Sequence, residues 1–255
     1  MTGKEAGVAL VTGGAKRIGR AIVEALAEAG WAVAIHCNTS RPEAESLAAE
    51  IRQRGGRAAV VTADLADPEQ TRTVVPRAAK ALGPVTLLVN SASLFIPDGI
   101  DALDDGVWQR QMTVNLQSPV TLIDALARGL PEGVEGHVVN ILDQRVLKPT
   151  PFFLSYQLSK SALATATPVL AQALAPRVRV NGIAPGPTLA SVRQAPEDFA
   201  RQSAAVMLGK GPDLSEFGRT ILYLVGTPSV TGQTIAIDGG QHLAWQTPDI
   251  VGIPE

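Results

Sequence analysis

Aromatic residues and cysteine are scarce in this chain. Aromatic side chains make up 4% of its 255 residues, and only Tyr156 and Tyr223 are tyrosines, so any chemistry that needs a phenol has two candidates. The single cysteine, Cys37, excludes an intramolecular disulfide and a cysteine-rich metal centre, and it is typical of a reducing compartment. The three histidines show no metal-ligand spacing, so we expect no metal site.

The chain also lacks a surplus of positive charge and a long apolar run. Lysine and arginine total 22 against 24 acidic residues, a formal net charge of -2, which does not favour binding to a nucleic-acid backbone. No apolar run reaches membrane-spanning length, and the first residues lack the apolar core of a secretory signal. We therefore expect a cytoplasmic protein with no nucleic-acid or membrane partner. The length predicts a single domain over residues 1–255.

Short apolar runs alternate with helical patterns along the chain. Because these runs are apolar almost throughout, they are typical of strands buried on both faces, and the helices between them indicate parallel pairing. The sequence predicts a doubly wound, Rossmann-like α/β fold with about seven parallel strands and helices on both faces. The predicted strands cover residues 8–11, 32–35, 58–63, 85–89, 137–141, 178–183 and 234–237.

Three segments depart from this regular alternation. Residues 187 to about 215 are the least regular and are interpreted as a substrate loop with short helices. Residues 241–255 are interpreted as a C-terminal extension. Pro168 lies inside the helical pattern over residues 152–174, where we expect it to kink the helix or end it early.

A glycine-rich turn joins the first predicted strand to the first helix. It reads Thr-Gly-Gly-Ala-Lys-Arg-Ile-Gly over residues 12–19. Backbone N–H groups and the helix dipole at such a turn suit a phosphate, and glycine lets the backbone approach it closely. We expect Gly13, Arg17 and Ile18 to contact a dinucleotide. An ordinary strand-to-helix turn is the alternative.

This turn resembles the T-G-x-x-x-G-x-G motif of the short-chain dehydrogenase/reductase family, with Arg17 at the middle glycine. The form T-G-x-x-K-R-x-G resembles the pteridine reductase branch, which includes dihydromonapterin and dihydrofolate reductases of this fold. An arginine at this position can reach the cofactor phosphates and also lie over the substrate pocket. Arg17 is therefore a candidate for both cofactor and substrate binding.

The end of the second strand indicates which cofactor is bound. A carboxylate about twenty residues after the glycine turn would bind a ribose 2′-hydroxyl, and none is present there. The stretch from His36 through Asn38, Thr39 and Ser40 to Arg41 supplies hydroxyl, amide and cationic groups instead, which favours a 2′-phosphate and hence NADPH over NADH. A solvated polar loop without a role is the alternative.

The resemblance implies further cofactor contacts at the carboxyl ends of later strands. One set corresponds to the family's adenine contact, a second to its N-N-A-G motif, and a third to its P-G turn over the nicotinamide. A helix cap is the alternative for Asp64. The residues in these three sets are Asp64, Leu65, Asn90, Ser91, Ala92, Pro185, Gly186 and Thr188.

Tyr156 and Lys160 lie four residues apart in a helical pattern, so their side chains share one face. A free phenol has a pKa of about 10, and a neighbouring ammonium lowers it by stabilising the phenolate. The resemblance implies that Tyr156 is the proton donor and that Lys160 also holds the nicotinamide ribose. Without the other motifs, this pair would indicate only an amphipathic helix. Tyr223 is interpreted as helix packing.

Asp143 lies 13 residues before Tyr156, where most of the family has a serine that donates to a substrate carbonyl. An ionised carboxylate cannot donate that hydrogen bond, but it accepts one from a ring N–H or an amino group. It donates a proton only if burial raises its pKa. Pteridine reductases have aspartate at this position, so Asp143 favours an N-heterocyclic substrate. A degraded site is the alternative.

Three further residues match family positions. Asn115 corresponds to the asparagine that holds a proton-relay water, although it is equally typical of a helix-interior amide bonded to backbone. Ser93 and Phe95 match pterin contacts, and the Phe95 ring is placed to sandwich a flat heterocycle against the nicotinamide. Ordinary loop packing is the alternative for Phe95.

Together these residues predict an NADPH-dependent reductase that transfers hydride to a C=N bond of a dihydropterin, dihydromonapterin or dihydrofolate. Tyr156, with Lys160 and Asp143, would supply the proton. A carbonyl reductase for ketones, aldehydes or 3-oxoacyl groups is one alternative, and a non-catalytic NADP(H)-binding sensor is another. The resemblance also implies a homotetramer built through the helices near residues 107–128 and 152–174.

Overall fold

A computed structural model describes residues 6–252 and shows one seven-stranded parallel sheet with the order β3-β2-β1-β4-β5-β6-β7. The predicted fold class is confirmed, and each strand lies within two residues of its predicted ends. The strands are β1 (Val8–Val11), β2 (Ala32–Cys37), β3 (Ala58–Thr62), β4 (Val85–Asn90), β5 (Gly136–Ile141), β6 (Val178–Pro185) and β7 (Thr234–Ile237).

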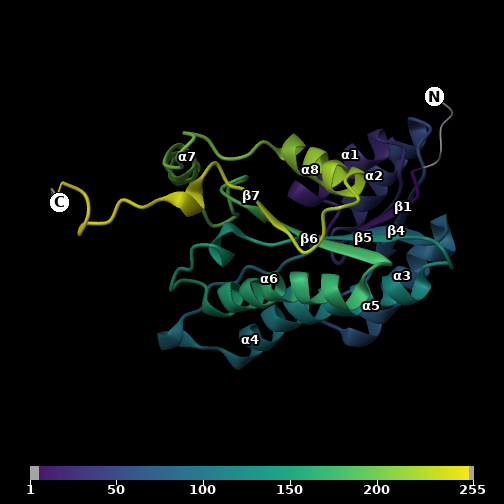
Figure 1. Cartoon of the computed structure of the whole chain (residues 1–255), viewed down its shortest axis with the longest axis horizontal. Helices are drawn as coiled ribbons and strands as arrows, with labels where there is room; N and C mark the ends of the chain where they lie inside the picture. The colour runs from purple at the N-terminus through teal and green to yellow at the C-terminus, as the bar shows by residue number, and fades with distance from the viewer. Residues whose placement is uncertain (1–5, 253–255) are drawn as a thin grey trace.

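Helices cover both faces of the sheet (Figure 1). One face carries α1 (Arg17–Glu28), α2 (Arg41–Gln53) and α8 (Leu214–Gly226). The other carries α3 (Pro68–Leu82), α5 (Ser118–Gly129) and α6 (Leu154–Leu174), with α4 (Asp105–Met112) against α6. Each layer buries its own apolar cluster against the strands, which explains why the central strands have apolar residues at successive positions.

Local signals set several helix boundaries. Asp67 caps α3 by accepting hydrogen bonds from the backbone N–H groups of Glu69 and Gln70, at 2.9 and 3.2 Å.

Helix α6 continues through Pro168 to Leu174, so the predicted early end is wrong. Proline removes one backbone hydrogen bond, but packing of the flanking turns against the sheet holds the helix together.

A single π-helical turn joins α4 to α5, where the sequence predicts an ordinary helix. It spans Thr113–Gln117 and contains Asn115. The extra residue per turn changes the direction in which side chains leave the helix. Asn115 is consequently buried between α6 and the loop that follows β4.

The irregular region contains one short helix, α7 (Pro196–Ala204), and is otherwise a loop, as predicted. Beyond β7, a short 3₁₀ turn at Gln241–Leu243 leads into a segment that runs out past α7 (Figure 1). The Lys148 ammonium donates a 2.6 Å hydrogen bond to the Ala244 carbonyl and ties the start of this segment to the body. Within residues 6–252, no helix is both long and apolar enough to cross a membrane.

Helix α8 offers a matched test of the buried core. Phe217 is fully buried, whereas Tyr223 on the same helix is 56% exposed. We expect Phe217→Ala to lower the free energy of unfolding by about 3–5 kcal/mol because it leaves a cavity between α8 and the sheet. Tyr223→Ala should change it by less than about 0.5 kcal/mol. Urea denaturation followed by circular dichroism measures both values, and equal losses would contradict this account of the core.

Candidate active site

The predicted site residues converge because the carboxyl ends of parallel strands meet at one edge of the sheet. The Thr12 hydroxyl, at the end of β1, accepts hydrogen bonds from the backbone N–H groups of Ser91 and Ala92 after β4, each at 3.0 Å. Gly13 has a φ of 63°, and a Cβ there would lie 3.0 Å from the Ala92 Cα. Only glycine allows this turn and this close approach.

The start of α1 fits a phosphate group. No side chain caps this helix, and its first turn contains no acidic residue, so its N–H groups are left for an anion. Arg17 has a φ of 55° at the first helical position. Gly19 allows the helix to approach the turn, because a Cβ there would overlap the Gly13 carbonyl oxygen. These features match the binding of a dinucleotide pyrophosphate.

His36 has a different role from the one the sequence predicts. Its side chain is 2% exposed, its Nδ1 lies 3.2 Å from the Gly13 N–H that donates to it, and its Nε2–H donates to the Ala63 carbonyl at 3.1 Å. Burial lowers the pKa of His36 from 6.5 to about 4, so the ring is neutral at neutral pH. His36 holds the glycine turn against β3 and cannot offer a charge to a phosphate.

The other residues predicted to bind a 2′-phosphate lie at the surface. Asn38 and Thr39 are exposed directly after β2, and the Ser40 hydroxyl makes no capping bond to α2 although it precedes that helix. Their amide and hydroxyl groups therefore remain accessible. The nearest cation on the glycine turn, Lys16, forms an exposed 2.8 Å ion pair with Glu43.

Two of the predicted cofactor contacts also have structural roles. One Asp64 carboxylate oxygen accepts from the Ala66 N–H at 2.9 Å and stabilises the turn before α3, whereas the residue that caps α3 is Asp67. Leu65 is buried. The Asn90 amide donates to the Asn140 side chain at 2.9 Å, across β4 and β5, and its side chain is 1% exposed. The Asn90 side chain thus braces the sheet.

The P-G turn after β6 is packed tightly against β7. A Cβ on Gly186 would lie 2.6 Å from the Asp238 Cα, so this position requires the smallest residue. The Thr188 hydroxyl donates to the Gly186 carbonyl at 3.1 Å. Its predicted contact with the nicotinamide carboxamide would require this hydroxyl to change its hydrogen-bond partner.

A small cluster of polar side chains lies where β5 ends and α6 begins. It consists of Tyr156, Asp143 and Lys160. The Tyr156 hydroxyl donates a 2.8 Å hydrogen bond to Asp143 Oδ2. Asp143 Oδ1 accepts from the Arg145 N–H at 2.9 Å, which fixes the carboxylate at the start of a 3₁₀ turn, Gln144–Val146. Lys160 donates to the Ile141 carbonyl at 2.7 Å, and its Nζ lies 6.0 Å from the Tyr156 ring centroid.

The electrostatics of this group differ from the prediction. Burial, followed by the Asp143 charge and its hydrogen bond, raises the pKa of Tyr156 well above 10, while Arg145 opposes the shift. Burial also lowers the pKa of Lys160 from 10.5 to about 8. The expectation that Lys160 lowers the phenol pKa is therefore wrong in this state, because the group in direct contact with the phenol is a carboxylate. Tyr156 keeps its proton at neutral pH.

Both polar atoms of the Asn115 side chain form hydrogen bonds within the protein. Its Oδ1 accepts from the Leu94 N–H and the Ser93 hydroxyl, at 2.8 and 3.2 Å. Its Nδ2 donates to the Leu94 carbonyl and the Ser159 hydroxyl, at 2.9 and 3.1 Å. Asn115 therefore braces the loop after β4 against α6, and its predicted hold on a relay water stays a prediction.

Phe95 lies beside the Tyr156 phenol, and its predicted contact with a pterin stays a prediction. Its ring stacks on Phe153 with centroids 4.2 Å apart and packs edge-on against Tyr156 at 4.6 Å. Arg17, the other predicted substrate residue, donates to the carbonyls of Leu189 and Ala190 at 3.1 and 2.9 Å. These contacts bring the glycine turn, the substrate loop and helix α6 together at one edge of the sheet.

Comparison with known proteins shows which family has this arrangement. A family model described as short chain dehydrogenase matches residues 7–199. The chain belongs to this family. The short-chain dehydrogenase is similar to two crystal structures of FolM alternative dihydrofolate reductase 1 with NADP, from Brucella suis and Brucella canis. They are 56% and 55% identical, cover 97% of this chain and 99% and 98% of theirs, and have TM-scores of 0.95. L-xylulose reductase from Bos taurus is 33% identical over 91% of this chain and 95% of its own length.

Sequence patterns assign no role to two arginines of this short-chain dehydrogenase that lie beside these rings. Arg145 lies two residues after Asp143, and Arg193 lies in the substrate loop; both guanidinium groups lie near the Phe95 and Phe153 rings. Phe153 has a φ of 57° at the start of α6. No local pattern signals a left-handed phenylalanine, and the spacing of Arg145 from Asp143 was the one available clue.

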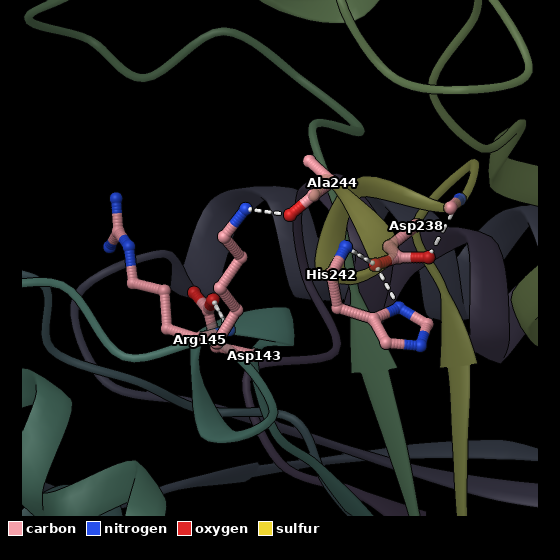
Figure 2. A network of polar contacts seen from close by, with 7 residues as sticks. Asp143, Arg145, Asp238, His242 and Ala244 are labelled. Carbon is pink, nitrogen blue, oxygen red and sulfur yellow. Dashed lines mark hydrogen bonds and ion pairs between the residues drawn. The ribbon is translucent and has the colours of Figure 1, made fainter. Parts of the chain in front are cut away.

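A second polar group lies nearby, at the end of β7 (Figure 2). Asp238 accepts from the Gly240 N–H at 2.9 Å and from His242, whose Nδ1 lies 2.7 Å from Oδ2. Hydrogen bonds from its neighbours lower the pKa of Asp238, against the effect of burial. This pair fixes the turn that starts the C-terminal segment, and Figure 2 shows Asp143 and Arg145 on a separate element from it.

Because the chain has only two tyrosines, the pKa of Tyr156 can be measured directly. In a Tyr223→Phe background, Tyr156 is the one remaining tyrosine. We expect Asp143→Asn to lower the pKa of Tyr156 by about one unit or more, because the variant removes a neighbouring negative charge. Alkaline difference spectroscopy of the phenolate band measures this shift, with circular dichroism to confirm folding. Asp124→Asn, which removes an exposed carboxylate on α5, is the control and should leave the titration in place. An unchanged pKa in Asp143→Asn would contradict the assigned cause.

Proposed function

We propose that this protein is an NADPH-dependent reductase that transfers hydride to a C=N bond of a dihydropterin, a class that includes dihydromonapterin and dihydrofolate. The observation that carries this proposal is the 2.8 Å hydrogen bond from Tyr156 to the Asp143 carboxylate. A carbonyl substrate would need a donor at position 143, whereas a carboxylate accepts hydrogen bonds from the N–H and amino groups of a pterin. The similarity to the two FolM structures with NADP supports it.

NADPH supplies the hydride when it is bound, and the protein supplies position and charge. The start of α1 binds the pyrophosphate, and Asn38, Thr39 and Ser40 bind the 2′-phosphate. Tyr156 holds a proton at neutral pH because of its raised pKa. To donate that proton to the ring nitrogen of the C=N group, its hydroxyl would turn from Asp143 to the substrate, and the phenolate that remains would take a proton from solvent before the next turnover. The negative charge of Asp143 stabilises positive charge that develops on the ring, which makes the neighbouring carbon a better hydride acceptor.

The absence of a carboxylate beside Asn38 leads to a prediction on cofactor choice. We expect kcat/KM to be at least about tenfold higher with NADPH than with NADH, because the 2′-phosphate finds donors and no repelling charge. Asn38→Asp should reduce this preference by about tenfold through repulsion of the phosphate. Steady-state oxidation of both cofactors measures the ratio, with Asn38→Ser as the neutral control. A preference of the wild type for NADH would reject the assignment.

Substrate panels distinguish the proposed reaction from its alternatives. We expect turnover of dihydrofolate, dihydromonapterin and dihydrobiopterin and little turnover of ketones, aldehydes or 3-oxoacyl thioesters, followed by the loss of NADPH absorbance. Tyr156→Phe should lower kcat by about 100-fold or more while NADPH still binds, and Asp143→Ser should lose pterin reduction. Turnover of ketones alone would favour a carbonyl reductase, as the similarity to L-xylulose reductase allows. Tight NADPH binding without turnover would favour a sensor.

A homotetramer and a cytoplasmic location stay predictions. Helix α6, which the resemblance assigns to subunit contacts, exposes Leu158 and Val169, at 42% and 55%. Apolar side chains on this helix are compatible with a contact between copies of the chain.

A further inference from the structure

Two arginines lie beside the stacked rings of Phe95 and Phe153. The Arg145 guanidinium carbon lies 5.3 Å from the Phe95 ring centroid and 5.4 Å from that of Phe153. The Arg193 guanidinium carbon lies 5.4 and 5.9 Å from the same two centroids. All four distances are within the range of cation–π contact. The two cations thus share one small aromatic platform.

Their hydrogen bonds leave most of their donors free. Across residues 6–252, neither guanidinium forms an ion pair with a carboxylate, and the Arg145 guanidinium makes no hydrogen bond. Arg193 donates once, to the Phe95 carbonyl at 2.8 Å. In Figure 2 the Arg145 guanidinium extends away from both Asp143 and Asp238. Each arginine has five N–H donors, so both retain the paired donors that bind a carboxylate in a fork.

Two positive charges near one aromatic platform repel each other, and an anion bound beside them would remove that repulsion. Arg145 is half-buried and rests on a turn fixed by Asp143, and Arg193 comes from a different element, the loop between β6 and α7. Their proximity to the same rings therefore follows from the tertiary fold.

The backbone at Phe153 is a second, independent observation. Its φ of 57° places a bulky residue in the left-handed region, which is rare outside functional sites. In this conformation the Phe153 ring is stacked on Phe95, and both arginines lie within 6 Å of its centroid. The fold therefore maintains a flat apolar surface with two cations at its side, close to Tyr156, where the Arg145 guanidinium carbon is 6.0 Å from the ring centroid.

We propose that Arg145 and Arg193 bind the carboxylate tail of the substrate, and that they select a pterin conjugated to an aromatic acyl-glutamate over a pterin with a short neutral side chain. This inference rests on the proposed function and names the substrate class within it. The benzoyl ring of such a substrate lies on the Phe95–Phe153 platform, and its glutamate carboxylates accept from the two guanidinium groups. A hydroxylated neutral side chain offers no charge to these arginines.

The test is the ratio of kcat/KM for dihydrofolate to kcat/KM for dihydrobiopterin. We expect Arg145→Met and Arg193→Met each to lower this ratio about tenfold, mainly through the KM for dihydrofolate, because each removes a charge-assisted contact but keeps an apolar stem. The double variant should lower it further. Arg193→Lys, which keeps the charge, should lose less. Arg201→Met, on the neighbouring α7, is the matched control and should leave the ratio unchanged.

Ionic strength gives a second readout. Added salt should raise the KM for dihydrofolate in the wild type and have less effect in the double variant, because screening weakens the lost contacts. Two results would overturn the inference. An equal loss of kcat/KM on both substrates would mean that the arginines only hold the aromatic platform in place, and no loss on either substrate would mean that they do not contribute to substrate binding.

Failure of the proposed function is separately visible. If the wild type reduces no pterin at all, calorimetry with p-aminobenzoylglutamate still tests the arginines. Binding that weakens about tenfold or more in the double variant would support the carboxylate site while rejecting pterin reduction. Equal binding by wild type and double variant would reject the carboxylate site as well.

Discussion

Parallel pairing of all seven strands is the constraint on which the site depends. Every loop that follows a strand leaves from the same edge of the sheet, so segments distant in the sequence meet there. The strand ends are also fastened to one another. Thr12 accepts hydrogen bonds from the N–H groups of Ser91 and Ala92. His36 is hydrogen-bonded to Gly13 and to the Ala63 carbonyl directly after β3, and Asn90 donates to Asn140. Because these bonds are buried or nearly so, they hold the cofactor turn and the catalytic residues in one rigid frame.

The electrostatics of the site follow from burying Tyr156 and Lys160 beside the half-buried carboxylate of Asp143. Burial disfavours charge on both Tyr156 and Lys160, which raises the pKa of one and lowers that of the other. Asp143 adds to the effect on the phenol by accepting its hydrogen bond. The result is a phenol that holds its proton beside a fixed negative charge. This arrangement suits a substrate that gains positive charge on nitrogen, and it disfavours one that gains negative charge on oxygen.

Two arginines connect the substrate loop to the rest of the site. Arg17 joins the glycine turn to the carbonyls of Leu189 and Ala190, and Arg193 joins the substrate loop to the carbonyl of Phe95. The substrate loop therefore contacts both the cofactor side and the aromatic platform. Substitutions in this loop can alter which substrates fit without moving Tyr156, because α6 and Asp143 hold that side chain.

Local sequence patterns are enough to predict the fold and most of the candidate site residues. Apolar runs, glycine turns and helix caps depend on local backbone physics, so the seven strands, the helix start at Pro68 and the Tyr156–Lys160 pair could be read directly. The protonation states of the buried groups and the positions of the two arginines depend on the tertiary structure. The neutral His36, the raised pKa of Tyr156 and the meeting of Arg145 with Arg193 depend on burial and on contacts between distant segments. Neither burial nor long-range distance is a property of a local pattern, which is why these features appear only once the strands are assembled.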